Sequence, residues 1–396
     1  MNIEADRIKN VQFSAIRKVL DKASALRNEG KRVIALSAGE PNFNTPEPIK
    51  EECIRAINEN YTHYGSNKGN PELRKIISKK IKEESGKEYD PESEIMFTTG
   101  GAEALNNIIL ALVNPGDEVI IISPAFVSYK NLVILCGGIP VEVPVLSSDN
   151  FIPDMEAVRR AVSDKTRMLI INNPNNPTGA VYSKEILQEL CDLSLERDFF
   201  ILSDEMYSSL VYEGSFCPIS SFDNMKDHVI VVNGFSKTYA MTGWRLGYLY
   251  TSREILMAIL KVHQYSSTCS PTFIQKGMVW AIESEGTTEA VKAMMDEFAA
   301  RRQLTVSLLE KINGISFVKP NGAFYVMLDV SETGLDGEGF ADELLKEELV
   351  AVVPAISMGK DDFYKNYVRI SFAASREDIT EGINKIGEFV NRKVRS

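Results

Sequence analysis

Three apolar runs in this chain each lead into polar side chains that can take part in catalysis. Residues 229–232 lead to Lys237, residues 199–202 lead to Asp204, and residues 168–171 lead to an asparagine- and proline-rich turn. A lysine amine can act as a nucleophile or a base once burial lowers its pKa. Unbroken apolar runs of this length are typical of strands buried on both faces of a parallel sheet. Because ligands bind at the carboxyl ends of such strands, the sequence predicts a site where these side chains meet.

Taken one at a time, these residues have ordinary interpretations. Most lysines lie on protein surfaces, and an aspartate that follows a strand often caps the next helix. The functional interpretation therefore depends on the residues as a set, in the order and at the distances in which they occur.

Three motifs carry a resemblance to the pyridoxal-phosphate aminotransferases of class I and II, which share the aspartate aminotransferase fold. They read N-P-x-N-P-T-G at 173–179, S-D-E-x-Y at 203–207 and S-K-T-x-x-x-x-G-x-R-x-G-Y at 236–248. The resemblance extends from A-G-E-P-N-F at 38–43 to Y-V-R-I-S-F at 367–372. It implies pyridoxal 5'-phosphate as cofactor and transamination between an L-amino acid, of aspartate, aromatic or aliphatic type, and a 2-oxo acid such as 2-oxoglutarate.

The resemblance implies catalytic roles for three residues. Lys237 matches the lysine that forms an imine with the cofactor aldehyde and, once substrate displaces it, carries the proton. Asp204 matches the partner of the pyridine nitrogen, which it keeps protonated so that the ring can accept electrons. Tyr207 matches a hydroxyl that reaches the cofactor oxygen. If the turn after Asp204 is helical, the spacing of three places both side chains on one face.

Further cofactor contacts follow from the same resemblance. Gly101 and Ala102 open an expected helix, whose free N–H groups and dipole suit a phosphate. Arg245 matches the bidentate partner of that phosphate. Phe126 matches an aromatic side chain that stacks on the cofactor ring. Tyr64 matches a residue that reaches the cofactor phosphate of the neighbouring subunit, which implies a homodimer with shared active sites.

Three residues are expected at the substrate. Gly39 matches a backbone contact to the substrate carboxylate, and Arg369 matches the planar clamp for it. Asn176 matches a residue that donates to the cofactor oxygen beside the substrate. One position departs from the family pattern: Gly234 stands where most members have a phosphate-binding serine or threonine, and Ser236 is a candidate to replace that hydrogen bond.

The residues expected around the donor side chain favour a neutral amino acid. Members that prefer aspartate use basic or hydroxyl groups at positions that correspond here to Ala102 and Ile16, with Phe13 nearby. A buried carboxylate without a partner is costly, so this pocket favours an aromatic or aliphatic donor. Against this, Lys68 lies beside Tyr64 and can supply the missing charge, and an acidic acceptor such as 2-oxoglutarate must also fit.

Composition restricts the remaining classes of function. The chain has 396 residues, 44% hydrophobic content and a net charge of −11, which disfavours nucleic acid and anionic membrane surfaces as partners. Its first residues are polar and mixed in charge, and no apolar run is long enough to span a membrane. Five cysteines without a C-x-x-C pair and three histidines predict no metal site and a cytoplasmic location.

Alternating strand and helix patterns predict an α/β fold with a mainly parallel sheet between helices, plus a smaller α+β domain. The resemblance implies that the sheet is of the seven-stranded type and that the first 40 or so residues complete the smaller domain. We expect residues 45–285 to form the large cofactor-binding domain, and residues 1–44 and 286–396 the small one. Predicted helices include 11–29, 154–162, 184–196, 253–263 and 288–311, and predicted strands include 33–36, 95–98, 119–122 and 139–145.

Two other functions remain open from the sequence. A pyridoxal-phosphate β-lyase that cleaves C–S bonds would share the cofactor residues, so only product analysis separates it from a transaminase. A non-catalytic sensor domain is disfavoured, because fewer than 40 residues precede the A-G-E-P motif and no basic DNA-binding module is seen.

Overall fold

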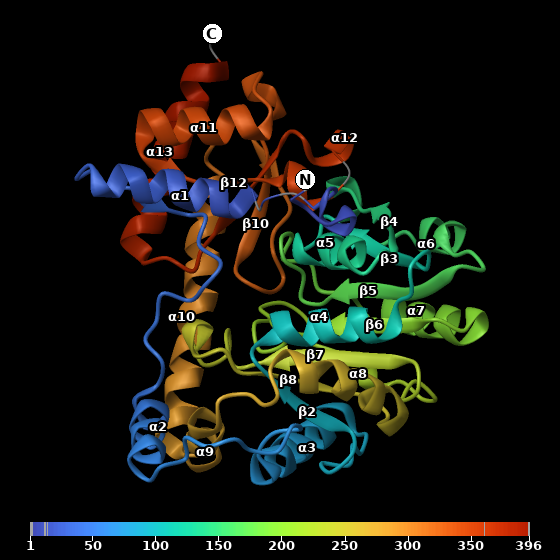
Figure 1. Ribbon diagram of the computed structural model, residues 1–396. Coiled ribbons are helices and arrows are strands. Elements are labelled where there is room, and N and C mark those ends of the chain that lie inside the picture. The colour runs from blue at the N-terminus through green and yellow to red at the C-terminus, as the bar shows by residue number, and fades with distance from the viewer. Residues whose placement is uncertain (1–2, 12, 14, 360, 395–396) are drawn as a thin grey trace.

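A seven-stranded sheet forms the centre of the protein (Figure 1). The structure, a computed structural model, describes residues 3–11, 13, 15–359 and 361–394. The sheet order is β2-β8-β7-β6-β5-β3-β4. The strands are β2 (Ile95–Thr98), β3 (Glu118–Ser123), β4 (Ile139–Pro144), β5 (Thr166–Asn172), β6 (Phe200–Asp204), β7 (Val229–Gly234) and β8 (Gly247–Tyr250). Strand β8 is antiparallel to β2 and β7, and the pairs from β7 to β4 are parallel. The predicted α/β fold is confirmed.

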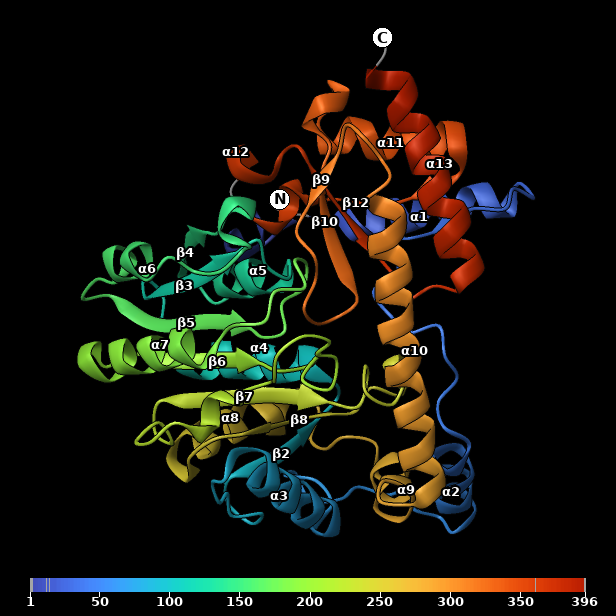
Figure 2. The same cartoon turned by 180° about the vertical axis from the view of Figure 1, so that it is seen from behind.

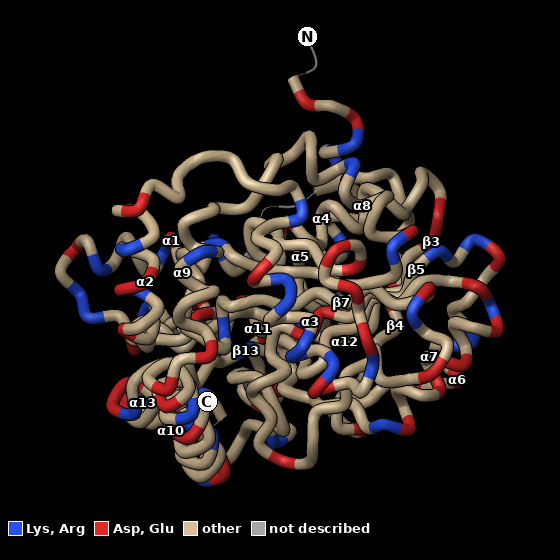
Figure 3. Tube along the Cα trace, turned by 90° about the horizontal axis from the view of Figure 1, so that it is seen from below, with Lys and Arg blue, Asp and Glu red and all other residues tan. Residues whose placement is uncertain are grey.

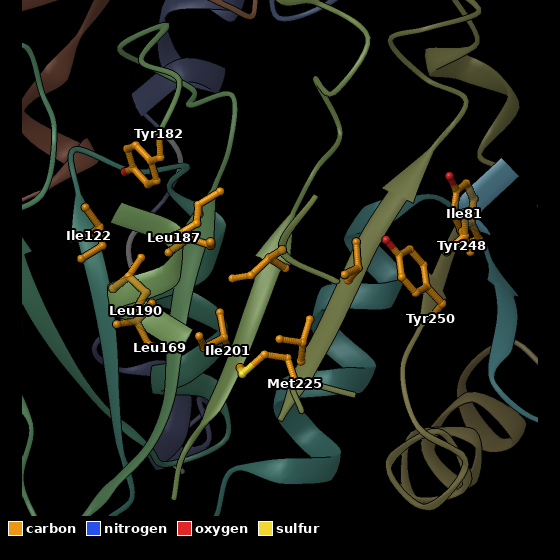
Figure 4. Packing of buried hydrophobic residues seen from close by; sticks show 14 of the residues in the cluster. Ile81, Ile122, Leu169, Tyr182, Leu187, Leu190, Ile201, Met225, Tyr248 and Tyr250 are labelled. Carbon is orange, nitrogen blue, oxygen red and sulfur yellow. The ribbon is translucent and has the colours of Figure 1, made fainter. Parts of the chain in front are cut away.

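Helices cover both faces of this sheet because alternate strand residues point to opposite sides. Ile230 and Val232 pack with the helices of one face, and Val229 and Val231 pack with those of the other. Figure 4 shows part of the second face, where Leu187 and other apolar side chains meet the strands. The first face carries α4 (Gly101–Leu112), α5 (Ser128–Leu135) and α8 (Arg253–Ser266); the second carries α3 (Pro71–Ser85), α6 (Met155–Ala161) and α7 (Lys184–Arg197).

A second, smaller group of elements lies beside the edge of the sheet at which the parallel strands end. Its antiparallel sheet has the order β12-β13-β10-β9, and a parallel pair joins β1 to β11. The strands are β1 (Ile34–Ala35), β9 (Ser316–Phe317), β10 (Tyr325–Asp329), β11 (Val350–Ala351), β12 (Val353–Pro354) and β13 (Tyr367–Ser371). The helices are α1 (Ala15–Asn28), α11 (Gly337–Glu348), α12 (Asp361–Tyr364) and α13 (Arg376–Val394).

The helix α10 (Glu285–Leu309) runs along the molecule between the two groups, as Figure 2 shows most clearly. Near its start it lies beside α2 (Glu47–Asn58) and α9 (Thr272–Ala281), and near its end it packs against α13. Helix α9 was not predicted. The expected division of the chain at residues 44/45 and 285/286 stays a prediction.

Short 3-10 helices complete the backbone. They are η1 (Asp6–Ile8), η2 (Ser147–Asp149), η3 (Ile219–Ser221), η4 (Thr242–Trp244), η5 (Ser331–Thr333) and η6 (Ala355–Met358).

Two local predictions need correction. The first helix begins at Ala15 rather than residue 11, and residues 12 and 14 of the predicted span lie outside the described residues. Directly after β6, residues 206–209 form a turn that belongs to no helix. The condition under which the spacing of three aligns Asp204 with Tyr207, a helical turn, is therefore not met.

Lysine and arginine residues are interspersed with aspartate and glutamate along the backbone trace in Figure 3. Many form ion pairs, such as Arg32 with Asp378 at 2.8 Å and with Glu381 at 2.6 Å. Among the described residues, no helix is both long and apolar enough to cross a membrane. The cytoplasmic location stays a prediction.

Candidate active site

A cavity of about 450 Å³ lies where β5, β6 and β7 end, beneath the smaller group of elements. This volume falls in the range of small-molecule sites. Ten of the eleven predicted cofactor and substrate residues line it, and Tyr64 alone does not. The ten are Gly39, Gly101, Ala102, Phe126, Asn176, Asp204, Tyr207, Lys237, Arg245 and Arg369.

Strand register explains why the polar side chains meet. Asn172 at the end of β5 pairs with Asp204 at the end of β6, and Asp204 pairs with Val232 near the end of β7. Lys237 follows β7 by three residues, so its amine reaches the same space. The carboxyl ends of adjacent parallel strands lie at one edge of the sheet, as the sequence predicted.

Asp204 is held by two hydrogen-bond donors. The Tyr129 hydroxyl donates to Oδ2 at 2.7 Å, and the Met206 N–H donates to Oδ1 at 3.1 Å. Burial raises the pKa of Asp204 above its ordinary value, while these two hydrogen bonds and the charge of Lys237 act in the opposite direction. A cation or N–H donor placed against this carboxylate would stabilise its charged form.

Lys237 has the features of a reactive amine. Its Nζ donates to the Gly39 carbonyl oxygen at 2.6 Å and lies 6.0 Å from the ring centre of Tyr207. Burial lowers the pKa of Lys237 to about 8; the nearby carboxylate of Glu40 raises it and the guanidinium of Arg369 lowers it. About a tenth of the amine is therefore unprotonated at pH 7, far more than for an exposed lysine.

Arg369 lies across the cavity from the sheet, on β13. Its Nη1 donates to Asn176 Oδ1 at 2.9 Å, its Nη2 donates to the Ser37 carbonyl at 3.2 Å, and the guanidinium covers the Tyr325 ring at 4.3 Å. Among the described residues, Arg369 Nε and Ser37 Oγ are buried without a hydrogen-bond partner. Buried polar atoms without partners are rare. Arg369 lines the cavity, and its planar guanidinium fits a carboxylate ligand.

The start of α4 lies against Arg245. Gly100 has a φ of 78°, and a Cβ there would come within 2.4 Å of Arg245 Nη2, so only glycine fits this position. The N–H groups of Gly101 and Ala102 are in the first turn of α4, where they have no intrahelical acceptor. Ser236 also lines the cavity. Free N–H groups, a helix N-terminus, an arginine and a hydroxyl together suit a phosphate.

The structure gives a physical reason for glycine at position 234. Gly234 pairs with Gly247 of β8, and a Cβ on Gly234 would lie 3.1 Å from Gly247 Cα and 3.2 Å from the Met206 Cε methyl. A serine there would need both neighbours to move by a few tenths of an ångström.

Three other predicted residues lie outside the cavity of their own chain. Tyr64 is 88% exposed, and Phe13 is fully exposed. Lys68 donates its ammonium to the Glu92 carbonyl oxygen. By contrast, Ile16 lines the cavity as expected.

Sequence reasoning missed some residues that the cavity brings together. Tyr129, Tyr325 and Glu40 line it, and the Tyr207 and Tyr325 hydroxyls lie 3.0 Å apart. Tyr129 follows Phe126 by three residues, the only signal that links it to the site, and Tyr325 sits in an ordinary apolar strand pattern.

Comparison with known proteins identifies the family. The family model of aminotransferase class I and II matches residues 31–386. The chain belongs to this family. It is 40% identical over 390 residues to the aspartate aminotransferase of Pyrococcus abyssi and, equally, to the aromatic-amino-acid aminotransferase 2 of Thermococcus litoralis, with 98% of both chains covered in each case. The structure of Thermus thermophilus aspartate aminotransferase with maleate matches with a TM-score of 0.93 and 38% identity, over 98% of this chain and 100% of that one.

This aminotransferase is therefore an enzyme that exchanges an amino group between an amino acid and a 2-oxo acid, as the sequence predicted. The family implies pyridoxal phosphate as cofactor. The donors at the start of α4, the carboxylate of Asp204 and the amine of Lys237 have chemistry that fits the phosphate, pyridine nitrogen and aldehyde of that group.

A second carboxyl group, Glu205, lies next to Asp204 but outside the cavity. Its Oε1 accepts hydrogen bonds from Ser203 Oγ and from the Ile219 N–H, both at 3.1 Å. Burial raises the pKa of Glu205 from 4.5 to about 8, although these two hydrogen bonds lower it. Between about pH 4.5 and pH 8, the carboxyl group of Glu205 is therefore protonated in the folded protein and ionised in the unfolded chain.

We predict that Glu205 makes the free energy of unfolding fall as pH rises from about 4.5 to about 8, with no further loss above that range. Glu205→Gln keeps a carbonyl acceptor and cannot ionise. The free energy of unfolding of the variant minus that of wild type should therefore be larger at pH 8.5 than at pH 5, by more than about 1 kcal/mol. Chemical denaturation at both pH values measures this. The exposed Glu283→Gln serves as control, and identical pH profiles for wild type and Glu205→Gln would contradict the prediction.

Proposed function

We propose that this aminotransferase binds pyridoxal 5'-phosphate in the cavity between β6, β7 and β13, with Lys237 as its covalent partner and proton carrier. The observation that carries the proposal is that Lys237 and Asp204 reach one cavity from adjacent strand ends, while Arg245 and Arg369 line the same cavity. When bound, the cofactor withdraws electrons from the substrate α-carbon.

The protein's own groups divide the remaining work. Asp204 pairs with the pyridine nitrogen, and Tyr129 holds the carboxylate in place for that contact. Gly101, Ala102 and Arg245 bind the phosphate, with Ser236 in the place of the usual serine or threonine. Phe126 packs on the ring face.

Tyr207 and Asn176 donate to the hydroxyl oxygen attached to the cofactor ring. Arg369 binds the substrate carboxylate beside the Gly39 backbone. Asn176 Oδ1 accepts from Arg369, so the orientation of its amide group is set by the carboxylate clamp. The Asn176 Nδ2 group can then donate toward the cofactor. Because the pKa of Lys237 is about 8, its amine can accept the α-proton and return it at a neighbouring carbon near neutral pH.

Lys237→Ala should abolish turnover while leaving the fold and part of the cofactor affinity intact, because the phosphate contacts do not involve the lysine. Borohydride reduction of wild type should attach the cofactor to residue 237, as read by mass spectrometry of peptides. Lys226→Ala, which removes an ammonium paired with Glu94 at 2.8 Å, is the control and should behave like wild type. Attachment at another lysine would overturn the assignment.

We also propose a homodimer in which Tyr64 completes the partner's active site. Tyr64 is 88% exposed and faces none of its own chain's catalytic groups. Its loop is nevertheless held in place, since Thr272 Oγ1 donates to the carbonyls of Tyr61 at 2.8 Å and His63 at 3.0 Å. A fixed, exposed tyrosine is suited to contact a second subunit.

Mixing Lys237→Ala with Tyr64→Phe subunits tests the shared site. Each heterodimer should contain one site with both groups intact and one site with neither. Activity should therefore rise above that of both parents as subunits exchange. Exchange demonstrated by labelled subunits, with activity fixed at the average of the parents, would exclude a role for Tyr64 across the interface.

The donor side chain is proposed to be neutral, of aromatic or aliphatic type. Apolar residues of α1 and α4 line the cavity, namely Ile16, Leu20, Ala102 and Leu105. The carboxylate of Glu40 lines it as well, where its Oε2 accepts from Thr242 at 2.8 Å. A second carboxylate brought by an acidic donor would meet like charge and apolar surface.

The values of kcat/KM for phenylalanine, leucine and methionine should exceed that for aspartate, with 2-oxoglutarate as acceptor. Glu40→Gln should raise kcat/KM for aspartate more than for leucine, since it removes like charge. A wild-type preference for aspartate of roughly tenfold, about 1.4 kcal/mol, would contradict the proposal. If wild type shows such a preference and Lys68→Ala loses it, Lys68 is the cation that binds the side-chain carboxylate of aspartate.

The relatives named above are aminotransferases, so the β-lyase alternative has no support from them.

A further inference from the structure

A nearly buried carboxylate, Glu103, holds the start of α4 and has no part in the chemistry proposed above. Its Oε2 accepts from the Thr99 N–H. Its Oε1 lies 2.8 Å from His263 Nδ1 and accepts from Asn107 Nδ2 at 3.0 Å and from Ser266 Oγ at 3.3 Å. The His263 side chain is fully buried, and that of Glu103 is 10% exposed.

Glu103 is charged in this environment. Burial alone would raise the pKa of its carboxyl, but hydrogen bonds from His263, the Thr99 N–H and Asn107 together lower it to about 2. The carboxylate follows Ala102 directly, so an anion is held beside the N–H groups proposed to bind the cofactor phosphate. Such a placement needs a compensating benefit, because like charges repel.

The benefit is that Glu103 holds one N–H group of this turn while the N–H groups that follow stay free for a ligand. The Thr99 N–H donates to Glu103, and the Gly100 N–H donates to the Thr98 carbonyl at 2.8 Å. Gly101 and Ala102 follow, and their N–H groups have no intrahelical acceptor. Glu103 therefore fixes the peptide between Thr98 and Thr99, two residues before the free N–H groups of Gly101 and Ala102.

The His263 contact is one-sided. Nδ1 faces Glu103, while Nε2 is buried without a partner among the described residues. An unpartnered buried nitrogen is costly, and an apolar side chain would fill the same space without that cost. The value of the imidazole must therefore lie in its Nδ1 contact with Glu103.

The same contacts reach the loop that carries Tyr64. Ser266 ends α8, and just beyond it the Thr268 carbonyl accepts from Asn67 Nδ2 at 2.7 Å. Gln264 Nε2 donates to Asn67 Oδ1 at 3.2 Å. The end of α8 thus touches both the turn that precedes α4 and the loop proposed to serve the partner subunit.

We propose that Glu103 and His263 are a positioning pair that shapes the phosphate-binding turn at residues 99–102 and anchors it to the end of α8. The proposal rests on the proposed function, because it assumes that this turn holds the cofactor phosphate. The pair acts through the Thr99 peptide and does not itself contact cofactor or substrate.

The test measures cofactor binding apart from turnover. Apo-protein is titrated with pyridoxal 5'-phosphate to obtain Kd, and kcat is measured at saturating cofactor. Glu103→Gln cannot accept at both of its terminal atoms, and His263→Leu lacks the Nδ1 donor. Each should raise Kd roughly tenfold or more, with kcat within about twofold of wild type, because each removes a hydrogen bond to a charged group that holds the turn.

Two further variants separate positioning from stability. His263→Asn places an amide N–H near the position of Nδ1 and should keep Kd within about threefold of wild type. Glu94→Gln is the matched control, because Glu94 is a buried carboxylate that accepts the Asp90 N–H at 2.6 Å and precedes the opposite end of β2. It should lose stability without a change in Kd.

The outcomes are distinguishable. A wild-type protein that binds no cofactor refutes the proposed function. A wild type that binds it, with Kd unchanged in Glu103→Gln and His263→Leu, overturns the positioning pair, as does an equal rise of Kd in Glu94→Gln. If the first two variants fail to fold, Ser266→Ala and Asn107→Ala each remove one donor to Glu103, and unchanged Kd in both would overturn the proposal.

Discussion

The meeting of strand ends at one edge of the sheet is the constraint on which this site depends. Parallel pairing of β5, β6 and β7 places Asn172, Asp204 and the approach to Lys237 side by side. Each strand is buried on both faces, so a shift in register by one residue would exchange the side chains that pack against the two layers of helices. The stability of the core therefore also fixes the spacing of the catalytic groups.

Close backbone packing is the second constraint. A Cβ on Gly247 would lie 2.7 Å from the Gly101 nitrogen, and a Cβ on Gly100 would collide with Arg245. The antiparallel strand β8 can press against the start of α4 only because these positions lack side chains. Gly234 extends the same packing by one strand, so the departure from the family pattern at this position has a steric consequence as well as a chemical one.

Polar groups at and near the cavity are each held in place by another polar group of the protein. Asp204 is held by Tyr129, Asn176 is held by Arg369, and Thr99 at the start of α4 is held by Glu103. Tyr129 and Arg369 each orient a polar side chain that lines the cavity, and Glu103 orients the peptide just before the residues that line it. A site built in this way loses little conformational entropy when a ligand binds, because its side chains and turns are already ordered.

The sequence by itself determined the fold class, the family resemblance and the set of residues that line the cavity. Motif order and spacing carry that information, since the residues 173–179, 203–207 and 236–248 each directly follow or end a strand. The tertiary structure alone decided which other groups join them. Tyr129, Tyr325 and Glu103 come from helix and strand patterns that look like ordinary core or surface, and their partners are 75, 118 and 160 residues away in the chain. Contacts at such separations depend on packing angles and register, which local pattern does not encode. The same reason explains why the sequence left open whether the turn after Asp204 is helical, whereas the structure shows a turn outside any helix at residues 206–209.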